Sequence, residues 1–273
     1  IGSGSGSHGN VNVSEALEVS CNYFFYTVAY RMNKGAGDLS GINTLNKYME
    51  AFGLNSPTGV EISELYDSMS QYPTHISSPE YKKYITQQRD ADAKESDYKW
   101  SAGDTIRTAI GQSYNNYTSA LMSKYVATLA NGGTRYSMHF LNKVTNNDGK
   151  TEEEYQPKVE SKIEIKKENL DAIFKGMFLV TTGPRGTLRN YFKDFPVDVA
   201  AKSGTAQQSS KRSEHTTFVA FAPLEDPQIS VCVIIPFGNG TTGPAPKVAK
   251  VAISEYLKLD YKPELKSYDT LLH

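Results

Sequence analysis

Three strand-like segments near the C-terminal end limit the possible folds of this chain more than any other feature. They cover residues 197–207, 216–222 and 229–237, and each is rich in small, β-branched or aromatic residues. The polar stretch 208–214 and the turn at 224–227 are too short to hold crossover helices. Neighbouring strands joined in this way pair as antiparallel hairpins. The segments therefore predict an antiparallel sheet.

Helical spacing of apolar residues dominates the rest of the chain. Residues 89–99 are charged and are predicted to be a solvated loop, and residues 134–165 are predicted to form hairpins with a turn at 147–149. Helices followed by an antiparallel sheet and a closing helix indicate an α+β fold, with the sheet flanked by helices. The predicted helices cover residues 14–32, 42–52, 79–88, 119–130, 168–181 and 246–258.

Start and stop signals frame several of these helices. Ser14, Ser78 and Thr118 are placed to cap helix starts, because their hydroxyls can accept a hydrogen bond from a free backbone N–H. Gly35 and Gly37 are expected to end the first helix.

Charge and cysteine content exclude several classes of protein. The chain has 29 Lys and Arg against 30 Asp and Glu, a net charge of −1, so we expect no nucleic-acid partner. No signal peptide or membrane-spanning apolar run is visible. Cys21 and Cys232 cannot form a disulfide framework and are expected to be small buried hydrophobes. No spacing typical of metal ligands occurs, so we expect no metal and no cofactor, with zinc ligands assembled across the fold as the alternative.

The first residues differ in character from the rest. Ile1 is followed by alternating Gly and Ser, a pattern typical of an engineered flexible linker. We therefore expect residues 1–7 to be such a linker and residues 8–273 to form a single domain.

The first candidate site lies on the first predicted strand, at Lys202-Ser203-Gly204-Thr205. Lys202 offers a cation for a substrate carboxylate. Gly204 lets a ligand backbone lie close to the strand. The strand edge offers N–H and C=O groups to an extended peptide. Taken alone, a surface strand with a lysine and a glycine is the commoner explanation.

The second candidate is Ser20-Cys21-Asn22, within the first predicted helix. The Ser20 hydroxyl can relay a proton, and the Asn22 amide can orient a substrate carbonyl. Taken alone, this is a polar pair on a helix.

Together, the Ser-x-Asn and Lys-Ser-Gly motifs resemble two of the three active-site motifs in the transpeptidase domain of class B penicillin-binding proteins. The stretch 100–114 is most similar to the elongation-type enzymes, usually called penicillin-binding protein 2. The resemblance implies the fold shared by penicillin-binding proteins and serine β-lactamases. Further segments that resemble the family are 8–9, 99–100, 103–105, 109–114, 130–133 and 218–223.

The resemblance also implies an activity, D,D-transpeptidation. The family cleaves the D-Ala-D-Ala end of a peptidoglycan stem peptide by acyl transfer to a serine, and β-lactams imitate that dipeptide. The implied partners are stem peptides, β-lactam antibiotics and the cell-wall elongation machinery. The implied location of the parent protein is the outer face of the cytoplasmic membrane, with this fragment itself soluble.

The resemblance assigns roles to individual residues. Ser20 and Asn22 relay a proton and orient the substrate, and Lys202 supports the hydrogen bonds around Ser20. Ser203 and Thr205 bind a carboxylate, and the Thr205 N–H supplies half of an oxyanion hole. On the same strand, Gly204 lies between them, and Gln207 shares the face of Thr205 and is expected to touch the ligand.

One family motif departs from its expected place. The nucleophile motif, Ser-x-x-Lys, should precede Ser-x-Asn, yet in this sequence it occurs only at Ser96–Lys99, after it. We expect Ser96 not to be a nucleophile, the N-terminal part of the domain to be missing, and the chain by itself to be inactive. The alternatives are a non-catalytic peptidoglycan-binding or scaffold domain, and a D,D-carboxypeptidase or β-lactamase on the same fold.

Three further residues have weaker signals. His215 could be read as a general base, but an exposed hairpin histidine is the commoner explanation. Tyr114 and Tyr117 flank a loop that the family places near its active site.

Overall fold

A three-stranded antiparallel sheet lies at the centre of the molecule. The computed structural model describes residues 8–35, 37–62, 74–206, 213–238 and 243–261. Strands β5 (Ala200–Ala206), β6 (His215–Ala222) and β7 (Ile229–Ile235) lie in the order β5-β6-β7, each antiparallel to its neighbour. The predicted antiparallel sheet and the α+β fold are confirmed.

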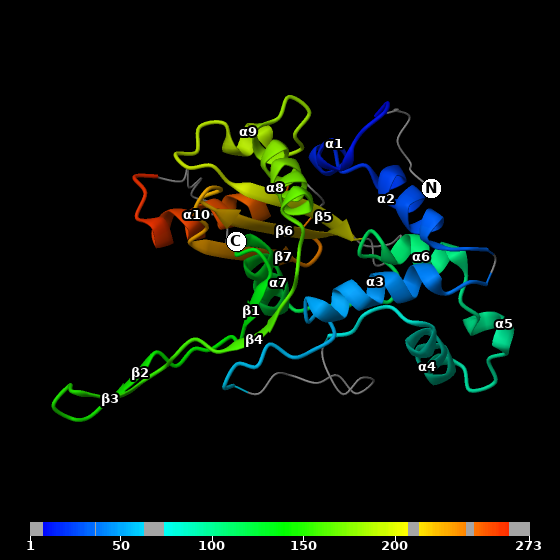
Figure 1. Cartoon of the computed structure of the whole chain (residues 1–273), viewed down its shortest axis with the longest axis horizontal. Helices are drawn as coiled ribbons and strands as arrows, with labels where there is room; N and C mark the ends of the chain where they lie inside the picture. The colour runs from blue at the N-terminus through cyan, green and yellow to red at the C-terminus, as the bar shows by residue number, and fades with distance from the viewer. Residues whose placement is uncertain (1–7, 36, 63–73, 207–212, 239–242, 262–273) are drawn as a thin grey trace, which may run out of the picture.

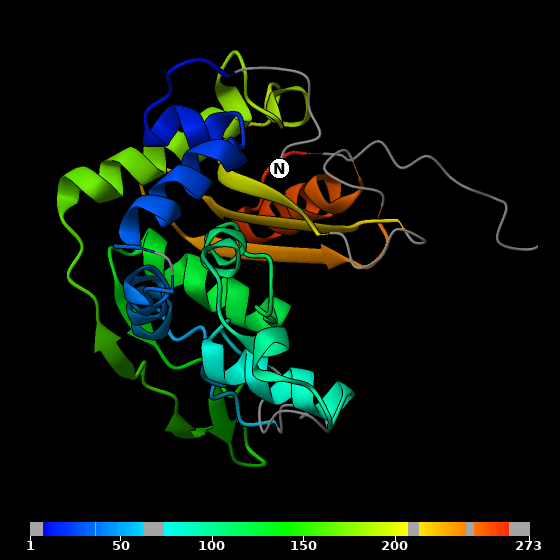
Figure 2. The same cartoon turned by 90° about the vertical axis from the view of Figure 1, so that its right-hand side faces the viewer.

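Helices cover both faces of this sheet (Figures 1 and 2). Side chains of β6 alternate between the two layers, as the two-residue period of a strand requires. Phe218 packs with α9 (Arg189–Phe192) and α10 (Ala245–Leu257). Phe221 packs on the opposite face with α7 (Ser119–Ala130) and α8 (Lys167–Thr182). Both phenylalanines are completely buried, and each contributes about 2–3 kcal/mol of hydrophobic stabilisation.

Most of the predicted helices form close to their expected bounds. The Ser78 hydroxyl caps α4 (Pro79–Arg89) by accepting from Tyr81 N at 3.0 Å, and Thr118 caps α7 by accepting from Leu121 N at 3.2 Å. Both predicted caps are therefore confirmed. Helices that agree with expectation are α3 (Ser40–Ala51), α4 (Pro79–Arg89), α7, α8 and α10.

The prediction of one helix over residues 14–32 is wrong. The segment forms α1 (Val13–Glu18) and α2 (Asn22–Met32), separated by three residues. Its apolar spacing continues in phase across the break, so periodicity alone could not reveal it.

The expected ends of this segment are also wrong. Asn12, not Ser14, caps α1 through a capping box with Glu15. The Ser14 hydroxyl instead donates to Ala172 O on α8 at 2.6 Å. Helix α2 ends at Met32, before the glycines, and the freed Met32 carbonyl accepts from the Ser40 hydroxyl.

The predicted loop over 89–99 contains a short helix, α5 (Glu95–Tyr98), and α6 (Ala102–Thr108) follows it without having been predicted. The start of α6 is fixed by a capping box between Ser101 and Asp104. Asp104 is buried, and Lys82 and Arg107 approach its carboxylate at 2.9 and 2.6 Å. Burial acts to raise the pKa of Asp104, but hydrogen bonds from Lys82 and Ser101 and the charge of Lys82 outweigh it, so the pKa is lowered.

A two-part β-ribbon projects from the body of the protein (Figure 1). At its base, β1 (Thr134–Tyr136) pairs with β4 (Val159–Lys162), and at its tip β2 (Lys143–Thr145) pairs with β3 (Thr151–Glu154). The turn predicted between β2 and β3 forms, with the Asn146 side chain accepting from the N–H groups of Asp148 and Lys150.

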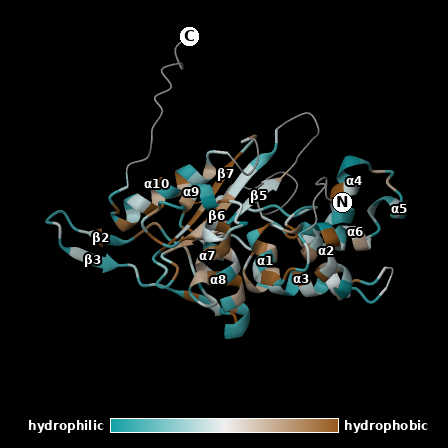
Figure 3. Cartoon of the chain, turned by 90° about the horizontal axis from the view of Figure 1, so that it is seen from above, coloured by the Kyte–Doolittle hydropathy of each residue, from teal (hydrophilic) through white to brown (hydrophobic). Residues whose placement is uncertain are grey.

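Hydrophilic residues cover this ribbon tip and the outer helices, while apolar residues gather around the central sheet (Figure 3). None of the described helices combines the length and the apolar character needed to cross a membrane. Cys21 is buried and Cys232 partly buried, and both are free thiols. Burial raises the pKa of the Cys232 thiol to about 11.

Candidate active site

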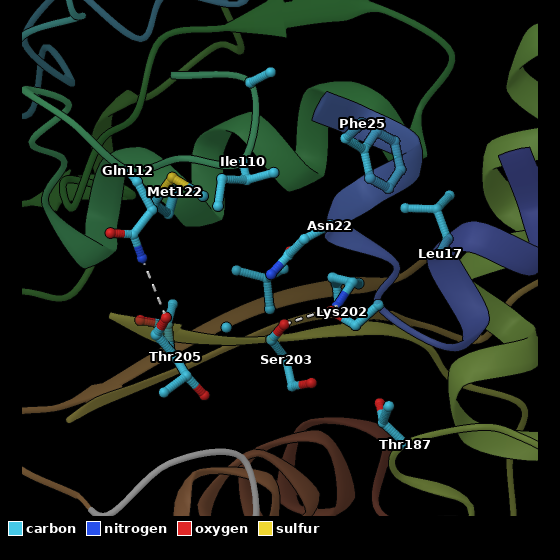
Figure 4. A pocket seen from close by; sticks show the side chains of 15 residues that line it. Leu17, Asn22, Phe25, Ile110, Gln112, Met122, Thr187, Lys202, Ser203 and Thr205 are labelled. Carbon is cyan, nitrogen blue, oxygen red and sulfur yellow. Dashed lines mark hydrogen bonds between the residues drawn. The ribbon is translucent and has the colours of Figure 1, made fainter. Parts of the chain in front are cut away.

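A pocket of about 560 Å³ lies between strand β5, the α1–α2 junction and the segment that follows α6 (Figure 4). Segments far apart in the sequence therefore meet at one place. Six of the seven predicted site residues line the pocket, whereas Gln207 lies outside the described residues. Those six are Ser20, Asn22, Lys202, Ser203, Gly204 and Thr205.

Strand β5 turns its backbone groups towards this pocket. Thr205 is paired with Thr216 of β6, and β6 lies on the other side of β5. The Ser203 carbonyl accepts from Lys202 Nζ at 2.8 Å, and the Thr205 carbonyl accepts from Gln112 Nε2 at 3.5 Å. Because the N–H and C=O of one strand residue point to the same side, the Thr205 N–H also points towards the pocket. An N–H in this position can stabilise negative charge on a bound carbonyl oxygen.

Gly204 lines the pocket and, because it has no side chain, leaves space open above strand β5. A methyl group added there would meet only Thr217, at an ordinary contact distance of 3.5 Å. Packing within the protein therefore does not require a glycine here. The open space is on the pocket side, as expected if a ligand backbone approaches the strand closely.

Lys202 joins the two sides of the pocket. Its Nζ lies 2.9 Å from the hydroxyl oxygen of Ser20, which belongs to the α1–α2 junction. Burial lowers the pKa of Lys202 to about 8, because the charged ammonium loses solvation. A lysine in this state is charged for most of the time at neutral pH, yet a larger fraction of it is neutral, and so available to take up a proton, than for an exposed lysine.

Ser20 does not lie in a helix, which corrects the expected placement. It follows α1 in the left-handed backbone region, with φ of 52°. Its N–H donates to Leu17 O at 3.2 Å, and the Cys21 N–H donates to Ala16 O at 2.8 Å. These two bonds form a Schellman motif, in which the left-handed position is usually glycine. A serine at this position adopts a less favourable backbone conformation than glycine would, and it places a hydroxyl at the edge of the pocket.

Asn22 begins α2 and is exposed on the other side of the Schellman turn. Its amide points into the pocket above Ser203 (Figure 4). It makes no hydrogen bond to any other residue that the structure describes. The amide is therefore available to a ligand carbonyl or amide.

Several pocket residues were not assigned a role from the sequence. Gln112 lies in the stretch 109–114 that carried part of the resemblance, so its signal was present but not used. Thr187 comes from the loop between α8 and α9, for which the sequence offered no signal. The apolar part of the lining consists of Leu17, Phe25, Ala109, Ile110, Met122 and Val219.

Tyr114 and Tyr117 do not line this pocket, although their loop lies beside it. Tyr114 packs against Tyr81 at 6.4 Å between ring centres. The Tyr117 hydroxyl lies 3.5 Å from Met49 Sδ, and burial raises its pKa. The loop beside these tyrosines thus contributes Gln112 to the pocket, while neither tyrosine lines it.

Other candidate residues also lie outside the pocket. Ser96 is exposed in α5, where its hydroxyl donates to Asp97, and neither Ser96 nor Lys99 lines the pocket. His215 is partly buried in β6, and its Nδ1 accepts from Phe237 N at 3.2 Å. Across the described ranges, no group of three or more His, Cys, Asp or Glu residues could hold a metal ion.

The arrangement is suited to acyl transfer. A serine and a partly desolvated lysine can exchange a proton, an amide can orient a carbonyl, and a strand edge can hold an extended peptide. Ser203 and Thr205 also line the pocket, so further polar groups that can contact a carboxylate lie on the strand that carries the Lys202 cation.

Comparison with known proteins gives consistent matches. Residues 3–253 match the family model described as the penicillin binding protein transpeptidase domain. The chain is 33% identical over 252 residues to the peptidoglycan D,D-transpeptidase MrdA of Escherichia coli strain K12. This match covers 87% of the chain but only 36% of the relative. The chain therefore spans about a third of the length of this relative.

Solved structures agree with this match. Penicillin-binding protein 2 of Pseudomonas aeruginosa, in complex with WCK 5153, is 28% identical with a TM-score of 0.70, over 94% of this chain and 51% of that chain. Penicillin-binding protein 2 of Helicobacter pylori, in complex with MreC, has a TM-score of 0.69 at 21% identity, over 93% of this chain and 42% of that chain. At the lower identity the similarity shows the fold alone.

Proposed function

The chain belongs to the penicillin-binding protein transpeptidase family, and from this premise we propose that it forms the pocket-bearing part of a serine-type peptidoglycan D,D-transpeptidase. One observation carries the proposal. Ser20, Lys202 and the outward N–H of Thr205 meet around a single pocket, although they come from distant parts of the chain. This combination offers proton transfer and oxyanion stabilisation at the same bound carbonyl.

In the proposed reaction a stem peptide lies along the open side of β5. Its terminal carboxylate binds to Ser203 and Thr205, near the charge of Lys202. The Asn22 amide holds a substrate carbonyl or amide from the opposite side. Gln207, two residues after Thr205 in the sequence, is proposed to touch the ligand as well. Strand addition of this kind derives affinity from backbone hydrogen bonds.

The chemistry is acyl transfer in two steps. A serine oxygen attacks the carbonyl between the two D-alanines, the C–N bond breaks, and the terminal D-alanine leaves with a proton. An amine from a second strand then attacks the acyl-serine and releases the serine. Ser20 and Lys202 are proposed to relay the proton in both steps, which general acid–base catalysis accelerates by about 100- to 10,000-fold.

The nucleophile is assigned to the serine of a Ser-x-x-Lys motif in the complete protein. Ser96–Lys99 is the single occurrence of this spacing in the printed sequence, and it lies away from the pocket. The 273-residue chain on its own is therefore proposed to fold without forming an acyl-enzyme.

The proposed partners follow from the relatives. The named activity of the Escherichia coli relative points to peptidoglycan stem peptides. The Helicobacter pylori structure is a complex with MreC, which supports a partner in the cell-wall elongation machinery. The proposed location of the complete protein is the outer face of the cytoplasmic membrane, where its substrate lies.

Intact-protein mass spectrometry after incubation with a penicillin, beside a thermal melt, tests the proposal. The complete protein should gain the mass of one penicillin, whereas the 273-residue chain should melt cooperatively without a mass shift. An adduct on Ser20 or Ser96 of the isolated chain would contradict the nucleophile assignment. A well-folded complete protein that gains no adduct would contradict the function itself.

Two other functions give different outcomes in the same experiment. A β-lactamase or D,D-carboxypeptidase would transfer the acyl group to water, so the adduct would disappear rapidly. A non-catalytic peptidoglycan-binding domain would bind stem peptides without any adduct in the complete protein. Transfer to an amine is favoured because the similar protein of Escherichia coli is named a transpeptidase.

A further inference from the structure

A buried carboxylate lies directly behind the Ser20 side of the pocket. Glu18 is the last residue of α1, two residues before Ser20, and only 3% of it is exposed. Its Oε1 accepts from the Arg185 N–H at 2.9 Å, and its Oε2 lies 3.8 Å from Arg185 Nη2. The carboxylate therefore ties the end of α1 to the loop between α8 and α9.

Gly183 makes room for this contact. A methyl group at Gly183 would collide with Glu18 Oε1 and approach Glu18 Cδ to 2.9 Å. The Gly183 backbone is not in the left-handed region, with φ of −64°, so its conformation alone does not call for glycine. The close approach of the carboxylate to the backbone is one reason for a glycine at this position.

The loop that receives Glu18 is held to α8, and α8 in turn is held to the residue before β5. Leu188 is completely buried, and its N–H donates to Val180 O at 3.0 Å. The Thr181 hydroxyl donates to Val199 O, next to the start of β5, at 2.6 Å. Thr187, between Arg185 and Leu188, lines the pocket (Figure 4). The loop thus connects the Lys202 side of the pocket to the end of α1.

Ser20 needs such support because its backbone is unfavourable. Its left-handed conformation is sterically less favourable for serine than it would be for glycine. Its hydroxyl faces solvent and Lys202 rather than a packed core. A hydroxyl on a short turn can move by an ångström if the helix end moves, and a misplacement of that size can lower a reaction rate by about 100-fold.

We propose that Glu18 is a positioning residue, whose buried carboxylate holds the end of α1 on the Arg185 N–H so that Ser20 presents its hydroxyl to Lys202. The proposal rests on the function proposed above. It assigns no chemical step to Glu18, which lies behind the pocket and does not line it.

The test uses the complete protein and measures penicillin acylation, separated into the dissociation constant of the first complex and the acylation rate constant. Glu18→Ala removes the anchor, and the acylation rate constant should fall by about ten- to a hundredfold. The dissociation constant should change little, because Ser203 and Thr205 remain in place. Glu18→Gln keeps an acceptor for the Arg185 N–H and should stay within about threefold of the wild type.

Two further variants separate positioning from general loosening of α1. Glu15→Ala breaks the capping box at the start of the same helix and should lower the melting temperature while preserving acylation. Glu18→Asp keeps the charge but shortens the side chain, so it should lose acylation even if Glu18→Ala fails to fold.

The outcomes are distinct. Normal acylation by Glu18→Asp and Glu18→Ala would overturn the proposal, as would an equal loss in Glu15→Ala. Failure of the wild-type protein to acylate would instead overturn the proposed function.

Discussion

The two sides of the pocket are built in different ways. On one side, β5 pairs residue by residue with β6 from Ala200 to Ala206, and buried layers lie on both faces of the sheet. On the other side, the three-residue junction between α1 and α2 is held by a Schellman turn and by the Glu18 carboxylate. Many weak contacts hold the strand in place, whereas a few specific contacts hold the junction.

This difference indicates how each side should respond to mutation. A substitution on β5 that keeps the strand pairing should change ligand chemistry while leaving the position of the backbone unchanged. A substitution at the junction should change both position and chemistry, because the same residues supply both. Four predictions follow this division, beginning with the largest effect.

Lys202→Ala should reduce penicillin acylation of the complete protein by about 100-fold or more, since it removes the cation beside Ser20 and Ser203. The melting temperature should remain within a few degrees, because backbone pairing of β5 does not depend on this side chain. Stopped-flow acylation and a thermal melt check both parts. Lys193→Ala, at an exposed lysine directly after α9, is the matched control. Unchanged acylation in Lys202→Ala would remove the assigned role.

Ser20→Gly should lower acylation by about 100-fold, because the hydroxyl that accepts from Lys202 is lost. The same change should preserve or raise the melting temperature, since glycine adopts a left-handed φ without steric cost. Differential scanning calorimetry and acylation kinetics on the same samples test this opposition. A clear loss of stability would mean that the hydroxyl is structural.

Gly204→Ala should lower acylation by about tenfold with little effect on stability. The added methyl meets Thr217 only at 3.5 Å and otherwise projects towards the bound ligand. Thermal melts and titration with a penicillin distinguish the two effects. If the variant binds and reacts normally, a ligand backbone does not lie over Gly204.

The smallest effect concerns pH and stability. The pKa of Lys202 is lowered by burial to about 8 in the folded protein, against 10.5 when unperturbed. Between these values the unfolded chain holds a proton that the folded chain has released, so stability should rise with pH across this window. Denaturant unfolding of the wild type and Lys202→Met, measured from pH 7 to about 10.5, isolates this contribution. The difference between the two proteins should change with pH in favour of the wild type, and a constant difference would show that Lys202 is well hydrated.

Sequence reasoning succeeded where local signals and tertiary structure agree. The strand containing Lys202 and the helix from Ser119 to Ala130 formed close to their predicted bounds, because alternation and capping are encoded in neighbouring residues. Six of the residues that the resemblance assigned to the site line one pocket in the structure. The roles assigned to these six residues and to Gln207 stay predictions.

Sequence reasoning failed where a contact with a distant part of the chain overrides the local sequence pattern. The helix predicted over residues 14–32 breaks at Ser20 without glycine or proline to signal it. The Ser14 hydroxyl, expected to cap the helix, instead binds a carbonyl of α8. Thr187 joins the pocket from a loop that has no recognisable motif.

Periodicity and motif order were therefore enough for the α+β class, the antiparallel sheet and the identity of the strand that carries Lys202. These features depend on residues close together in the chain. The break that places Ser20 opposite Lys202, and the carboxylate of Glu18 behind it, depend on α1 packing against α8 and the following loop. Contacts between residues more than 150 positions apart leave no local pattern, so the folded molecule alone reveals them.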